Sequence, residues 1–283
     1  MAPKPKHSLP KRLMTKIIRH TVPEPLMPGP YMTKLVAART GMVVQSGPFS
    51  GMRYIAKSHH SQLIPKWLGI YERELIGAVE EAIGLQPDTV VDVGAAEGYY
   101  AVGLALRMPQ TQIIAFEMVP EARELLTNLA EINGVSDRIT IRGACRSRDL
   151  AEVLENTGNT LVVCDVEGAE AYLLDPIRVP GLNRCHILVE LHDIKLGGIS
   201  EELRGRFSAT HDIEHIWEEK RERSEFPYQT FYTKMIPSSL DVAVSEVRAG
   251  RMAWYWMRPL ASAAKTQQPA TVEDKQLQEP LLR

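Results

Sequence analysis

The chain has few cysteines, little net charge and no long apolar stretch, and each absence excludes a class of protein. Its three cysteines, Cys145, Cys164 and Cys185, cannot all pair with one another. Two of them lie in apolar runs, as free cysteines that pack like small hydrophobes do. This usage favours a reducing compartment, and we expect a cytoplasmic protein. The net charge is −2, which gives no general attraction to nucleic acid. No run approaches the ~20 apolar residues of a spanning helix, so we expect no stable membrane insertion.

The two ends of the chain differ in composition from its middle. Six basic residues precede the first acid, Glu24, without the apolar core of a secretory signal. We interpret this end as a solvated basic arm, and a membrane-surface arm, an RNA-contacting arm or a transit peptide is left open. Proline and glycine are frequent over 21–50, as in a connector. Few anchoring side chains remain beyond Pro259, and we predict a disordered tail over 261–283.

Between these ends, short apolar runs rich in β-branched residues alternate with helical patterns. Strands are predicted over 89–93, 112–116, 138–142, 161–165 and 186–191, with later ones over 212–217 and 252–257. Helices are predicted over 71–85, 99–107, 120–133, 149–155, 200–208 and 240–249. Alternation of this kind predicts an α/β fold with a parallel sheet covered on both faces.

The first predicted strand ends in the sequence DVGAAEG, residues 92–98, and a helix follows. Ligands of open α/β sheets bind at the carboxyl ends of the strands, and glycines let the backbone approach them closely. A dinucleotide site has the spacing G-x-G-x-x-G, but Ala96 stands where the second glycine is needed. An NAD(P)-dependent oxidoreductase is therefore the weaker alternative. A Walker loop is excluded because no lysine follows Gly98.

Carboxylates and a histidine follow the later strands at the same edge of the predicted sheet. Glu117 ends the second strand, about twenty residues after the loop. A carboxylate at this place can accept hydrogen bonds from both hydroxyl groups of a ribose. The residues after the fourth and fifth strands are Asp165, Glu167, Glu190, His192 and Asp193. We expect these side chains to share one crevice, and Glu170 to face solvent on the next helix.

Three segments together resemble one known family. They are VDVGAAEGYY at 91–100, AFE at 115–117 and DVEGAE at 165–170. These segments are similar to the FkbM-like branch of class I S-adenosylmethionine-dependent methyltransferases, and the resemblance covers residues 71–193. It implies a doubly wound, mostly parallel, Rossmann-like sheet of seven strands with the seventh antiparallel. It also implies a methyltransferase domain over 71–260, preceded by an arm and cap segment over 1–70.

The resemblance also implies which residues contact the cofactor S-adenosylmethionine. One departure concerns the stretch after the third strand, 143–145, which lacks the acid that many class I enzymes use for the adenine amino group. The predicted cofactor contacts are Asp92, Gly94, Ala95, Glu97, Gly98, Glu117 and Asp165.

The activity implied is methyl transfer, and we expect O-methylation of a small hydroxylated metabolite or sugar. No N-P-P-Y motif of adenine-directed nucleic-acid enzymes follows the fourth strand, so no nucleic-acid partner is expected. His192 is the first candidate base because its ordinary pKa lies near neutrality, and Asp193, Glu167 and Glu190 follow. A divalent cation held by Asp165, Glu190 and Asp193 is left open. A non-catalytic cofactor-binding module and a homo-oligomer also stay open.

A second motif points to zinc. His211 and His215 fit the pattern H-x-x-E-H, in which two histidines on one helix face bind the metal. On a strand the same residues would lie ~13 Å apart and could not share an ion. Because we predict a strand over 212–217, we expect no zinc site there.

Overall fold

The computed structural model describes residues 28–59, 61–194, 197–248 and 250–261. They form two compact units: one joins 28–73 to 220–247, and the other joins 74–219 to 248–261. The contacts thus group 220–247 with the N-terminal segment. The basic arm and the predicted tail lie outside the described residues. Across the described ranges, no helix combines the length and the apolarity needed to cross a membrane.

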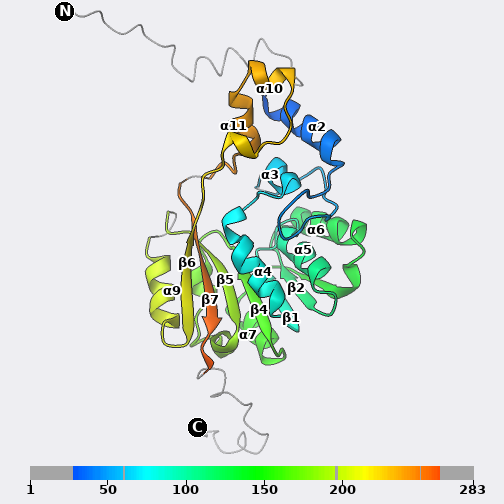
Figure 1. Ribbon diagram of the computed structural model, residues 1–283. Coiled ribbons are helices and arrows are strands. Elements are labelled where there is room, and N and C mark those ends of the chain that lie inside the picture. Colours follow the sequence, from blue (N-terminus) through cyan, green and yellow to red (C-terminus); the bar gives the residue numbers. More distant parts are fainter. Residues whose placement is uncertain (1–27, 60, 195–196, 249, 262–283) are drawn as a thin grey trace, which may run out of the picture. The chain divides into compact units, whose positions relative to one another are not determined.

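The second unit is built on one seven-stranded sheet (Figure 1), in the order β3-β2-β1-β4-β5-β7-β6. Strands β1 to β5 are parallel, and β7 is antiparallel to both of its neighbours, β5 and β6. The predicted doubly wound, mostly parallel α/β sheet is therefore confirmed. The bounds are β1 Thr89–Val93, β2 Gln112–Phe116, β3 Ile139–Arg142, β4 Thr160–Cys164, β5 His186–Leu191, β6 His211–Trp217 and β7 Ala253–Pro259.

Helices cover both faces of this sheet. The helices of the unit are α4 Ile76–Gly84, α5 Tyr99–Arg107, α6 Pro120–Ile132, α7 Ser147–Glu155, α8 Glu170–Leu173 and α9 Ile199–Phe207. Val91 and Val93 of β1 share a core with Leu150 of α7 and Phe207 of α9. Helices α5 and α6 pack against β3, and α5 also packs against β1 and β2. All five residues of β4 are buried, as a central parallel strand requires.

The first unit is a small helical assembly. Its helices are α2 Pro28–Thr40, α3 Leu63–Leu68, α10 Phe231–Met235 and α11 Ser238–Val244. Helix α11 packs against both α2 and α3, although about 200 positions separate it from α2 in the sequence. The helix predicted over 240–249 ends at Val244, because Ser245 already has an extended backbone with ψ 137°. Arg221 and Glu246 form a buried ion pair in this unit.

Candidate functional site

The loop after β1 depends on two glycines in the left-handed region. Gly94 has φ 86° and Gly98 has φ 96°, a conformation that side chains with a Cβ rarely adopt. A Cβ built on Gly94 would lie 1.7 Å from the carbonyl oxygen of Asp165. The loop after β1 therefore packs directly against the chain that leaves β4. Ala96 is also strained, with φ 46°, in keeping with the concentration of strained residues at ligand sites.

Glu117, at the end of β2, holds this loop in place. Its Oε2 accepts a hydrogen bond from the backbone N–H of Ala96 at 2.8 Å, and its Oε1 accepts one from Val119 at 2.7 Å. Each carboxylate oxygen keeps a further lone pair for another donor. The residue predicted to bind ribose therefore lies against the glycine loop.

The other predicted cofactor contacts line the end of β1. Asp92 is buried, and its Oδ2 accepts no hydrogen bond from the described residues. Burial, reinforced by the negative charge of Asp165, raises the pKa of Asp92 to about 7. Ala95 and Glu97 are buried as well. A buried carboxylate oxygen without a donor is rare in folded proteins, and it suits a ligand that brings a donor.

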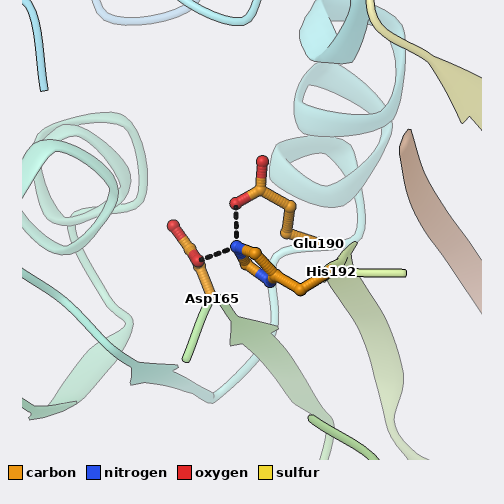
Figure 2. Close-up of side chains that lie close together, drawn as sticks. All are labelled: Asp165, Glu190 and His192. Atoms are coloured by element: carbon orange, nitrogen blue, oxygen red, sulfur yellow. Dashed lines mark ion pairs between the residues drawn. The ribbon is translucent and has the colours of Figure 1, made fainter. Parts of the chain in front are cut away.

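A group of acids surrounds one histidine at the carboxyl ends of β4 and β5. We call Asp165, Glu167, Glu170, Glu190 and His192 the strand-end cluster. Nδ1 of His192 lies 2.6 Å from Oε1 of Glu170. Its Nε2 lies 3.4 Å from Glu167, 3.5 Å from Glu190 and 3.7 Å from Asp165, and Figure 2 shows the last two contacts. The predicted crevice therefore brings together four of the five candidates, and Glu170 joins them.

The expectation that Glu170 faces solvent is wrong, because its side chain is fully buried. The turn after β4 places Glu167 at φ 58° and Gly168 at φ 115°, and helix α8 is only one turn long. The carboxylate of Glu170 consequently folds back to accept hydrogen bonds from the amides of Val166 and Gly168, at 3.3 and 3.1 Å. Burial alone would raise the pKa of Glu170, but its hydrogen bond with His192 and the backbone amides around it, that of Gly168 included, lower the pKa.

Asp193 lies apart from the strand-end cluster. Its Oδ1 accepts a hydrogen bond from the amide of Ser200 at 3.0 Å, in the first turn of α9. A carboxylate there satisfies an amide that the helix itself leaves without a partner. Of the groups considered for a cation, the structure brings His192 rather than Asp193 to Asp165 and Glu190.

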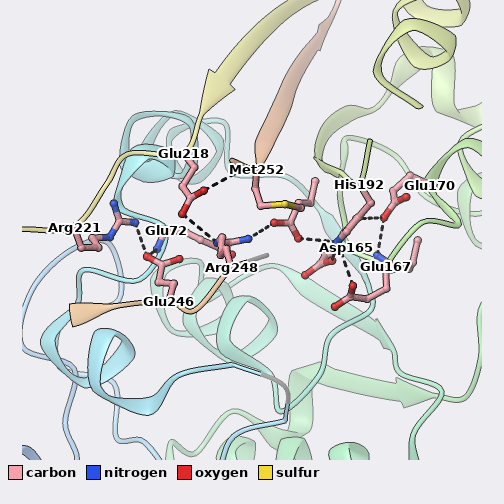
Figure 3. A network of polar contacts seen from close by, with 12 residues as sticks. Glu72, Asp165, Glu167, Glu170, His192, Glu218, Arg221, Glu246, Arg248 and Met252 are labelled. Carbon is pink, nitrogen blue, oxygen red and sulfur yellow. Dashed lines mark hydrogen bonds and ion pairs between the residues drawn. The ribbon is translucent and has the colours of Figure 1, made fainter. Parts of the chain in front are cut away.

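Arg248 was missed by sequence reasoning, which placed it inside a helix. It forms an ion pair with Oε1 of Glu190 and lies 4.0 Å from Glu218 (Figure 3). Arg248 opposes the positive charge of His192. Burial also lowers the pKa of His192, but Glu170 and Asp165 outweigh both effects, and the pKa is raised. No local pattern could have identified this arginine, since 58 positions separate it from Glu190.

The zinc motif lies on a strand, as predicted. His211 and His215 both belong to β6. Nε2 of His211 lies 2.9 Å from the carbonyl oxygen of Cys185, whereas His215 stacks on Trp217. The two imidazoles thus have separate structural partners and do not share a metal site.

The seven-stranded sheet with an antiparallel β7 is the arrangement that the sequence resemblance implied. The chain is similar to the solved human methyltransferase 10 domain containing protein, at 15% identity over 79% of this chain and 96% of that one, with a TM-score of 0.46. It is also similar to precorrin-6y C5,15-methyltransferase from Geobacter metallireducens GS-15, at 15% identity over 64% and 86%, with a TM-score of 0.42. At this level the similarity concerns the fold alone. No family model and no curated protein matches the chain.

Proposed function

We propose that this chain is an S-adenosylmethionine-dependent methyltransferase. The observation that carries the proposal is the contact between the Glu117 carboxylate and Ala96, in the glycine loop at the carboxyl ends of β1 and β2. A ligand-binding crevice is expected at this edge of an open α/β sheet. The loop departs from the dinucleotide pattern at Ala96, and the antiparallel β7 departs from the parallel order of the dinucleotide-binding fold.

The residues present fit the chemical groups of this cofactor. The two oxygens of Glu117 suit the two ribose hydroxyls, and Oδ2 of Asp92 suits the ammonium group, which has only donors to offer. Gly94 and Gly98 let the backbone come close without a Cβ. When bound, the cofactor supplies a methyl group already activated on a sulfonium. The protein then has to align the acceptor with it and exclude water.

We propose further that the acceptor is a hydroxyl group of a small metabolite or sugar. Such a group loses a proton when it is methylated, so a base beside the cofactor assists the transfer. The strand-end cluster is adjacent, because Gly94 lies against the carbonyl of Asp165. Within the cluster, His192, Glu167 and Glu190 are the candidate proton acceptors. Asp193 is a weaker candidate because its carboxylate already accepts a hydrogen bond from the backbone amide of Ser200.

Calorimetry with S-adenosylmethionine and the full chain tests the cofactor. We expect one bound molecule per chain, and about 10- to 100-fold weaker binding in Glu117→Ala, the range for hydrogen bonds to a charged group. Glu121→Ala is the matched control, because Glu121 is an exposed acid in the first turn of α6. Wild-type protein that binds NADH and no S-adenosylmethionine would overturn the proposal.

Turnover needs a separate measurement. The wild-type chain is incubated with host extract and cofactor carrying an isotope-labelled methyl group, and the products are analysed by mass spectrometry. Label on the oxygen of a small hydroxylated compound supports the proposed acceptor. Label on nitrogen or carbon contradicts it, and cofactor binding without label in any product indicates a non-catalytic module.

A further inference from the structure

We propose that Asp165, Glu190 and His192 bind one divalent cation, and that Glu170 orients the imidazole toward it. One ligand atom from each of the three residues lies within 4.8 Å of the other two. Figure 2 shows the imidazole Nε2 pointing at the two carboxylates. The site is argued from its own geometry, and only its role in methyl transfer rests on the proposed function.

Glu170 fixes the tautomer of the His192 ring. Its carboxylate accepts hydrogen bonds from two backbone amides, so Nδ1 of His192 is the donor in their 2.6 Å contact. Nε2 then faces carboxylate oxygens of Glu167, Glu190 and Asp165 at 3.4 to 3.7 Å. These distances exceed the usual 2.7–3.2 Å of an N–H···O bond. A positive charge is needed between Nε2 and these oxygens, and either a proton on Nε2 or a bound cation supplies it.

The donor atoms are spaced nearly as they would be around one cation. Two ligand atoms, each about 2.1 Å from one cation, lie about 3.0 Å apart at a right angle and about 3.4 Å apart at the tetrahedral angle. Nε2 lies 3.5 Å from Oε2 of Glu190 and 3.7 Å from Oδ1 of Asp165. A bound cation would draw the two carboxylate oxygens, which lie within 4.8 Å of each other, toward itself and toward Nε2.

Negative charge is in excess around His192. The cluster has four carboxylates, and among the groups described around it only Arg248 stays positive when His192 binds a cation through Nε2. Glu190, Glu170 and His192 are all at least nine-tenths buried, and an excess of buried negative charge is costly. Arg248 pairs with Oε1 of Glu190, whereas Oε2 is the oxygen that faces His192. A dication there would offset two of the remaining negative charges without displacing the arginine.

The ring nitrogen of His192 that faces away from the proposed cation is held by Glu170. Histidines that bind metals almost always donate their other N–H to a carboxylate or carbonyl, which fixes the tautomer and orients the ring. Glu170 occupies that position, and the amides of Val166 and Gly168 hold it in turn. The donor set of one imidazole and two carboxylates lies between the preferences of Zn²⁺ and Mg²⁺, so Mn²⁺ is a suitable probe.

A cation at this site would assist the proposed methyl transfer by activating the acceptor hydroxyl. The acceptor hydroxyl would occupy an open coordination position, where the positive charge lowers its pKa. Glu167, whose side chain is 61% exposed, would take the O–H proton. The acceptor oxygen would gain the methyl group as the bond from that group to the sulfonium sulfur is broken, so no group would be oxidised or reduced. This assigns Glu167 as the proton acceptor and His192 as a ligand.

Manganese binding to the chelator-treated full chain tests the site, by calorimetry and by electron paramagnetic resonance with MnCl₂. We expect one saturable Mn²⁺ per chain, and no saturable binding in His192→Ala or in the nearly isosteric Asp165→Asn. Glu170→Gln should bind about 10- to 100-fold more weakly, as other losses of a supporting carboxylate do. Glu201→Gln, at an exposed acid on α9, is the matched control and should bind like wild type.

The outcomes separate this inference from the proposed function. Each variant is first checked for an intact fold by circular dichroism, and S-adenosylmethionine affinity is measured beside Mn²⁺ affinity. Wild type that binds the cofactor and no Mn²⁺ overturns the cation site and leaves the methyltransferase proposal standing. Wild type that binds Mn²⁺ and no S-adenosylmethionine supports the cation site and overturns the methyltransferase proposal. Unchanged Mn²⁺ affinity in folded Asp165→Asn would also overturn the site.

Discussion

Two histidines of the sheet-bearing unit are equally buried, each 3% exposed, yet they have opposite surroundings. Burial would lower the pKa of His192, but the carboxylate of Glu170 outweighs it and the pKa is raised. His211 is placed between the carbonyl of Cys185 and the hydroxyl of Thr210, and burial lowers its pKa. The contrast shows that burial alone does not decide the charge of an imidazole. The groups gathered around it do, and carboxylates surround only His192 of these two.

Two arginines repeat the contrast. Arg248 and its partner Glu190 are both largely buried, with side-chain exposures of 13% and 3%. Arg258 of β7 pairs with Glu81, Asp212 and Glu214, whose side chains are 42% to 68% exposed. Exposed ion pairs contribute little to stability, whereas removing one partner of a buried pair leaves an uncompensated charge. The carboxyl ends of the strands are therefore the region where single substitutions should have large effects.

The largest effect is expected for Gly94→Ala. The new Cβ would meet the carbonyl oxygen of Asp165 at 1.7 Å, in a backbone conformation that alanine rarely adopts. We expect at least about 100-fold weaker binding of S-adenosylmethionine in calorimetry, together with a lower melting temperature. Gly205→Ala is the control, since a Cβ on that residue of α9 meets nothing within 4 Å. Near-normal binding by Gly94→Ala would mean that the loop does not contact the cofactor.

The next largest effect concerns the two arginines. Arg248→Met should lower the free energy of unfolding by about 3–5 kcal/mol, because it leaves Glu190 buried without its partner. Arg258→Met is the matched comparison and should cost about 1 kcal/mol. Urea unfolding at low and high salt measures both. Salt should reduce only the smaller cost, since screening acts on exposed charges. Equal costs would remove the distinction between the two ends of the sheet.

The smallest effect is the pH dependence contributed by His211. Its pKa is lowered in the folded state, so the unfolded chain binds more protons below its ordinary pKa of about 6.5. The contribution to stability is therefore full above that pH and is lost as the pH falls from it through the lower pKa of the folded state. His211→Gln should lose less stability than wild type on acidification, when urea unfolding is compared above and below this value. An equal or larger loss in the variant would contradict a neutral His211.

The order of the elements could be predicted from the sequence because the signals are local. The strands over 89–93, 112–116 and 186–191 are confirmed residue for residue, and the other four agree to within two positions at either end. Strands β1, β4 and β5 are apolar runs, and nearly all of their residues are buried, as parallel strands covered on both faces require. The loop over 92–98 could be located from the same local information, and its glycines Gly94 and Gly98 both have positive φ.

The tertiary structure decided which side chains meet. The local pattern placed acids after β4 and β5, but the left-handed backbone of Glu167 and Gly168 turned Glu170 inward and left Glu167 at the surface. Asp193 went to the start of α9, and Arg248 reached Glu190 from a distant part of the chain. The sequence by itself therefore determined the sheet and the edge at which the candidate site residues gather. Contacts between distant residues determined which charges are buried together there, because burial and pairing depend on the packed fold rather than on neighbours in sequence.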